Sequence, residues 1–109
     1  MNVTIRPAAR EDILRQFRYY LIEKDADAAA KRFLEAVEAA IEDVARHPEM
    51  GVRKILKNAV LQGLRTWPVK GFPSMRIYYL SPTDGLRVVR VLHGRRDVNT
   101  MLEEDVSEF

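Results

Sequence analysis

The spacing of apolar residues predicts a short strand followed by a long amphipathic helix. Val3 and Ile5 alternate with polar residues across residues 2–6, which is typical of a strand with one covered face. Pro7 follows directly, and proline suits the first turn of a helix because the N–H that it lacks has no partner there. From this proline to about Lys24, apolar side chains recur at helical spacing at Ile13, Leu14, Phe17, Tyr20 and Leu21.

A second helix is predicted to follow with almost no linker. Asp25 is its candidate N-terminal cap, and the apolar stripe repeats at Phe33, Val37, Ala40, Ile41 and Val44. The pair His47-Pro48 ends this helix, because a residue that precedes proline is disfavoured in the helical region. Two adjacent amphipathic helices with so short a connection are expected to form an antiparallel hairpin.

The period changes at Leu64, where three short strands begin. Residues 64–69, 74–80 and 86–93 are rich in β-branched and aromatic residues, and turn-forming clusters at 70–73 and 81–85 separate them. Residues 55–61 fit either a short third helix or an irregular loop. The sequence therefore predicts an α+β fold with an N-terminal strand and an antiparallel helix hairpin, packed on an antiparallel sheet that ends in a three-strand meander.

The last strand carries apolar residues on both faces. Strict alternation places Arg90 with Val88 and Leu92, and His93 with Val89 and Val91. A strand of this kind is typical of the centre of a sheet that is covered on both sides. We therefore expect Arg90 to lie in a partly covered pocket or to pair with an acid.

Composition bounds the class of protein. The chain has 109 residues, 47% apolar and 31% charged, and we interpret residues 1–109 as a single domain with an acidic tail at 101–109. Cysteine is absent, which excludes disulfides and thiolate zinc sites; two histidines alone predict no metal site, and no cofactor motif is found. With no apolar segment near 20 residues and no apolar signal core, we expect a cytoplasmic protein.

Charge is distributed unevenly along the chain. Residues 1–50 hold eight basic and ten acidic residues, whereas residues 51–100 hold ten basic and two acidic ones. The last nine residues hold four acidic residues and no basic one. A basic segment of this kind predicts an acidic partner, either a nucleic acid or an acidic protein segment.

Basic and aromatic residues gather on or just after the predicted strands. They are Arg65, Arg76, Arg87, Arg90, His93, Arg95 and Arg96, together with Trp67, Tyr78 and Tyr79. Arginine suits phosphate or carboxylate, because its planar fork matches both geometries. The alternative is that the arginines solvate a sheet face and pair with helix acids, that the histidine is a structural residue, and that the tryptophan belongs to the core.

Three segments resemble the ParE branch of the RelE/ParE toxin superfamily: Leu64–Val69, Met75–Tyr79 and Val88–Asp97. The run Arg-Val-Leu-His-Gly-Arg-Arg-Asp is the most specific part, and the resemblance covers about residues 2–99. It implies a toxin of a type II toxin–antitoxin module. It also implies a cognate ParD-like antitoxin, whose ribbon-helix-helix part binds DNA and whose flexible acidic and apolar C-terminal segment wraps the toxin. The toxin itself is then not expected to read DNA sequence.

The resemblance is compatible with two activities, which have different targets. ParE-like members inhibit DNA gyrase, whereas RelE-like members cleave mRNA on the ribosome, often with a tyrosine near the C-terminus. Val98-Asn99-Thr100 stands where that tyrosine is expected, which favours gyrase and a protein that is not an enzyme.

Two alternatives stay open beside gyrase inhibition. A nuclease would use Arg65, Arg76, Arg90 and His93, and the third interpretation is a non-toxic interaction module. The candidates for binding antitoxin or target are Arg65, Trp67, Arg76, Tyr78, Arg90, His93, Arg95 and Arg96.

Overall fold

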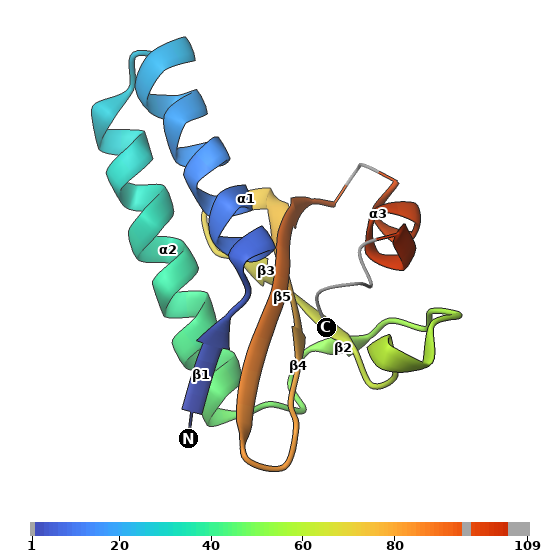
Figure 1. Cartoon of the computed structure of the whole chain (residues 1–109). Helices are drawn as coiled ribbons and strands as arrows, with labels where there is room; N and C mark the ends of the chain where they lie inside the picture. The colour runs from blue at the N-terminus through green and yellow to red at the C-terminus, as the bar shows by residue number, and fades with distance from the viewer. Residues whose placement is uncertain (1, 95–96, 105–109) are drawn as a thin grey trace.

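The computed structural model describes residues 2–94 and 97–104, in which a helix hairpin covers one face of a five-stranded sheet (Figure 1). The strands are β1 (Asn2–Ile5), β2 (Val52–Arg53), β3 (Arg65–Val69), β4 (Phe72–Leu80) and β5 (Gly85–His93). The helices are α1 (Pro7–Arg18), α2 (Asp27–Arg46) and α3 (Val98–Glu104). Within the described ranges, no helix is both long and apolar enough to cross a membrane.

The helix hairpin forms as predicted, with one difference at its tip. The first helix begins at Pro7 and continues past Arg18 as a π-helical turn over Tyr19–Glu23. Asp25 is not the cap of α2, because it adopts a positive φ of 46° and reverses the chain, a conformation that aspartate tolerates better than most residues. The second helix therefore begins two residues later, and it ends before His47 as the His-Pro pair predicts.

The predicted meander is confirmed, and β1 makes the sheet a mixed one. The strand order is β1-β5-β4-β3-β2, with antiparallel pairs from β5 to β2. The N-terminal strand runs parallel to β5, with Asn2 opposite Gly85 and Ile5 opposite Val88. Gly85 is required at this point, because a Cβ there would collide with the backbone oxygen of Asn2. For residues 55–61, the sequence fits either a short third helix or an irregular loop. The structure has a loop there that ends in a 3₁₀ turn at Ala59–Leu61.

A β-bulge shifts the register between β4 and β5. Tyr78 lies opposite Arg90 and Tyr79 opposite Val88, so that Val89 is the extra residue. As a result, Val88 and Val91 belong to the core under the helices, whereas Val89 belongs to the core on the other face with Leu92. The strict alternation predicted for this strand is therefore wrong, since one inserted residue changes the face of everything after it.

Both faces of the sheet are covered. The helix-side core includes Phe33, Val37, Val44, Ile77 and Tyr79. The second core contains Leu61, Leu64, Tyr78, Val89 and Leu92, and α3 covers it with Val98 and Leu102. A carboxylate oxygen of Glu103 accepts hydrogen bonds from the backbone of Lys57 and Asn58, which fixes this helix to the loop before β3. Residues 101–104 of the predicted tail are thus helical, and residues 105–109 lie outside the described residues.

Candidate functional site

Arg90 is held by a carboxylate of the first helix. Its Nε donates to Oδ2 of Asp12 at 2.6 Å and its Nη2 to Oδ1 at 2.8 Å, which is a bidentate charged pair. The same carboxylate accepts the backbone N–H of Val91 at 3.0 Å and lies 3.6 Å from Nη1 of Arg15. The side chain of Asp12 is only 2% exposed. The prediction that Arg90 pairs with an acid is therefore confirmed.

Arg65 and Trp67 start from the helix side of the sheet. Nη1 of Arg65 donates to the carbonyl oxygens of Glu49 at 3.1 Å and Gly51 at 2.8 Å. Carbonyls are neutral acceptors, so the positive charge of this guanidinium is not cancelled by these bonds. Trp67 is half-buried against the helix-side core, as expected of a core residue.

Arg76 and Tyr78 belong to the opposite face. Nε of Arg76 donates to Oγ1 of Thr66 at 3.0 Å, and the ring of Tyr78 is buried in the core under α3. Burial raises the pKa of Tyr78 above its ordinary value, although the hydrogen bond with Thr66 and the charge of Arg76 act in the other direction.

His93 lines a separate small cavity of about 60 Å³ with Asp12, Arg15 and Met75. Arg95 and Arg96 lie outside the described residues. The predicted candidates therefore occupy several separate places and do not form one constellation.

Tyr79 is one of the aromatic residues of the predicted strands, and in the structure its hydroxyl has a specific structural role. Its hydroxyl donates to the carbonyl oxygen of Pro48 at 2.7 Å and accepts the N–H of Gly51 at 3.0 Å. Burial raises the pKa of this phenol, against the opposing effects of the Gly51 bond and the charge of Arg65. A Cβ at Gly51 would collide with the phenol, so glycine is needed there. The buried tyrosine thus fixes the turn between α2 and β2.

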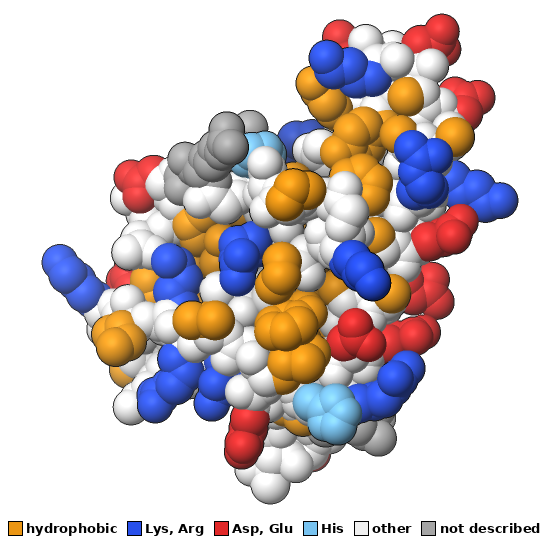
Figure 2. Space-filling model, turned by 180° about the vertical axis from the view of Figure 1, so that it is seen from behind, with side chains coloured by type: hydrophobic (Ala, Val, Ile, Leu, Met, Phe, Trp, Pro, Cys, Tyr) orange, Lys and Arg blue, Asp and Glu red, His pale blue; other side chains and the backbone are white. Residues whose placement is uncertain are grey.

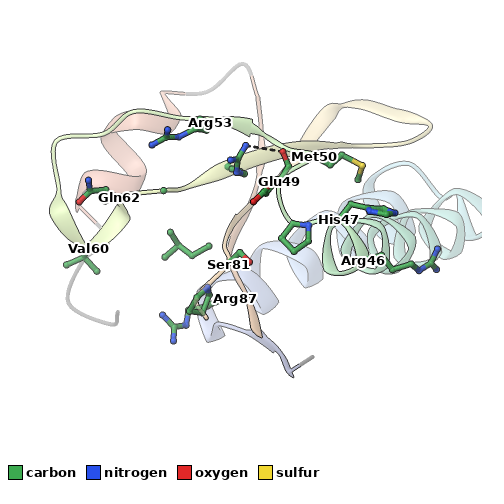
Figure 3. Close-up of a pocket in the computed structure, with 14 residues that line it drawn as sticks. Arg46, His47, Glu49, Met50, Arg53, Val60, Gln62, Ser81 and Arg87 are labelled. Atoms are coloured by element: carbon green, nitrogen blue, oxygen red, sulfur yellow. Dashed lines mark hydrogen bonds between the residues drawn. The ribbon is translucent and has the colours of Figure 1, made fainter. Parts of the chain in front are cut away.

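That turn borders a hollow of the surface. It is an open depression of about 900 Å³ (Figure 3). Its basic residues come from three strands and the end of one helix: Arg46 and His47 at the end of α2, Arg53 on β2, Arg65 on β3 and Arg87 on β5. Glu49 is the one carboxylate among the described lining residues. The depression is therefore electropositive.

Sequence reasoning named only part of this lining. Arg65 and Arg87 were recognised as basic strand residues, whereas Arg46 and Arg53 were not singled out. Arg46 reads as the ordinary basic residue of a last helical turn, and Arg53 stands in a strand of two residues that shows no periodicity. The excess of basic over acidic residues after residue 50 is a signal that could have found Arg53, but it does not extend to Arg46.

Acidic residues are unevenly distributed on the surface. Figure 2 shows Asp and Glu mainly along the helical side of that view, whereas Lys and Arg occur on both sides, with apolar patches between those on the sheet side. Within the described part of the chain, no group of three or more His, Asp or Glu residues is placed to hold a metal ion. The site is therefore one of cations and apolar surface.

Comparison with protein families shows to which family this chain belongs. The family described as the ParE toxin of type II toxin-antitoxin system, parDE, matches residues 3–98. The chain belongs to the ParE toxin family. The match runs from β1 to the first residue of α3, so it includes the helix-side core, the buried residues of the second core except Leu102, and the whole depression. A ParE toxin of a parDE module has a ParD antitoxin as its partner. No curated protein matches the chain.

Proposed function

We propose that this ParE toxin arrests growth by binding and inhibiting DNA gyrase, and that its cognate ParD antitoxin neutralises it. The family match supports a toxin, and the resemblance of the strand motifs to gyrase-inhibiting members supports the target. The observation that carries the choice of a binding protein over a nuclease is the engagement of Arg90 by Asp12.

A nuclease needs a proton acceptor, a proton donor and a cation around one phosphate. Arg65 and Arg76 start from opposite faces of the sheet, and Arg90 already has a carboxylate in its fork. His93 borders the small cavity beside that same carboxylate. The four candidates for phosphodiester cleavage do not surround a common point, which supports inhibition through binding.

The direct test compares two purified systems. We expect the toxin to inhibit DNA supercoiling by gyrase and to leave mRNA intact on translating ribosomes. Cleavage of mRNA with normal supercoiling would contradict the proposal and favour the nuclease. Normal growth of cells that express the folded toxin without antitoxin would favour a non-toxic interaction module.

A substitution of His93 separates the same alternatives in cells. We expect His93→Ala to retain growth arrest, because a binding inhibitor needs no general acid or base. A nuclease would lose its activity by orders of magnitude with this substitution. The measurement is growth after induction, with circular dichroism and antitoxin binding as controls that the variant is folded.

A further inference from the structure

The depression at the end of α2 continues into a second hollow along the loop that follows β2. The second hollow is about 350 Å³, shares Arg53, Gln62 and Gly63 with the first, and is lined by Lys54 and Lys57 as well. We call the two hollows together the β2 groove. The two hollows adjoin at these three shared residues.

The β2 groove combines cations with exposed apolar side chains. Ile55, which lines the second hollow, is 89% exposed, and Val60, which lines the first, is 50% exposed. Solvent-exposed aliphatic residues gathered beside arginines fit a ligand that is both acidic and apolar.

Aromatic residues are missing from this surface. Neither hollow has a Phe, Tyr or Trp among its described lining residues. Surfaces that bind single-stranded nucleic acid without sequence preference stack successive bases on aromatic side chains. The lining therefore favours an acidic peptide over a nucleic acid.

The sheet also ends at this groove. The order of the strands ends at β2, which pairs only with β3 among the described strands, and both of its residues are exposed. An edge strand offers unpaired backbone groups with which an extended segment can align. The groove is thus suited to a peptide in extended conformation.

We propose that the β2 groove docks an extended acidic segment of the ParD antitoxin, with carboxylates against Arg53, Arg65 and Arg87 and an apolar side chain against Val60. This inference rests on the proposed pairing of the toxin with its antitoxin, and adds where that antitoxin binds. The opposite sheet face is less suited to it, because α3 covers its core and Arg76 bonds with Thr66. Arg90 is likewise already held by Asp12.

The test measures antitoxin affinity for matched charge variants of the full-length toxin. The double variant Arg53→Gln, Arg87→Gln removes two cations from the groove. The control, Arg18→Gln with Arg32→Gln, removes two exposed cations near the tip of the hairpin, at the other end of α2 (Figure 1). We expect the groove variant to bind purified cognate ParD about 100-fold more weakly, and the control to change affinity by less than about threefold.

A third variant tests the apolar contact. Val60→Asp places a carboxylate where the acidic segment is expected, and we expect it to weaken ParD binding at least about tenfold. Val60→Leu keeps the apolar surface and is expected to bind as the wild type does. Circular dichroism and thermal unfolding check that each variant is folded.

Three results would overturn this inference. The first is unchanged ParD affinity in the groove variants. The second is loss of growth arrest with unchanged ParD affinity, which would assign the groove to the target. The third is a groove-dependent affinity for an oligothymidylate of about 20 nucleotides with unchanged ParD affinity, which would assign it to nucleic acid. If the wild-type toxin fails to bind ParD, the proposed function fails first, and this inference with it.

Discussion

At the scale of single residues, Asp12 takes the place that a neighbouring strand would occupy beside β5. Pairing of β1 with β5 ends at Val88, and the carboxylate then accepts the N–H of Val91 while it holds the guanidinium of Arg90. One buried group therefore satisfies a strand edge and a partly buried cation. Such a pair is costly to break from one side, because the remaining charge stays largely buried after the opposite charge is removed.

Removal of this carboxylate is expected to destabilise the fold strongly. Asp12→Ala leaves Arg90, whose side chain is only 13% exposed, without its charged partner. We predict a loss of about 3–5 kcal/mol in the free energy of unfolding, measured by urea denaturation. The control Glu11→Ala, one residue away and exposed, should change it by no more than about 0.5 kcal/mol. Equal effects of the two variants would contradict a structural role for the pair.

Tyr79 is expected to couple stability to alkaline pH. Its pKa is raised above the ordinary value of 10.0, so the unfolded chain releases this proton first. The contribution to stability is complete below about pH 10 and is lost as pH rises through the pKa of the folded protein. Tyr79→Phe should cost about 1–3 kcal/mol near neutral pH, because the buried groups of Pro48 and Gly51 lose their partner. It should also show a smaller decline in stability between about pH 10 and 11, measured by urea titration at each pH. An identical decline in both proteins would contradict this coupling.

At this scale, the sequence can identify the partner of a side chain only when the two residues lie close together along the chain. The two-sided apolar pattern around Arg90 predicted that an acid would pair with it. Which acid it was could not be predicted, because Asp12 lies 78 residues away and looks like an ordinary polar residue of an amphipathic helix. The hydrogen bonds of the Tyr79 hydroxyl could not be predicted either, because the turn that it fixes shows no apolar periodicity in the sequence.

At the scale of elements, the helices were the most predictable part. Their apolar stripes and the His-Pro stop are local signals, and α2 follows them closely. Two features of the sheet were not predictable because they depend on contacts between distant segments. The bulge at Val89 exists only in the pairing with β4, and the parallel direction of β1 follows from the long path through the hairpin.

Gly85 allows β1 and β5 to pair, and alanine there is expected to loosen them. The added Cβ would collide with the backbone oxygen of Asn2, which cannot rotate away as a flexible side chain could. We predict a loss of about 1–3 kcal/mol in stability, with faster hydrogen exchange in β1 than in the rest of the sheet. Gly71→Ala is the control: its φ is +87° and the space around it is open, so it should cost about 1 kcal/mol without this local effect. Uniform exchange across the sheet would contradict the prediction.

At the scale of the whole molecule, the two ends of the protein differ in structure and in charge. The protein extends 41 × 28 × 21 Å, with the hairpin tip at one end and the depression beside the other end of α2 (Figure 1). Basic residues outnumber acidic ones by ten to two in the sheet half at residues 51–100, whereas residues 1–50 hold eight basic and ten acidic residues. An acidic partner is therefore attracted in a preferred orientation before contact.

This orientation should be visible in kinetics. We predict that association of the toxin with its acidic antitoxin slows at least about tenfold between about 0.03 and 0.3 M salt, whereas dissociation changes much less. Stopped-flow fluorescence at several salt concentrations measures both rates. An association rate that does not depend on salt would mean that the segregated charges do not guide the encounter.

The parallel pairing of β1 with β5 has a consequence for synthesis. Gly85 is synthesised 83 residues after its partner Asn2. The helix hairpin can form early from local contacts, but β1 cannot pair in the sheet until β5 has been made. A product that terminates before β5 therefore lacks the finished sheet and cannot act as a folded toxin.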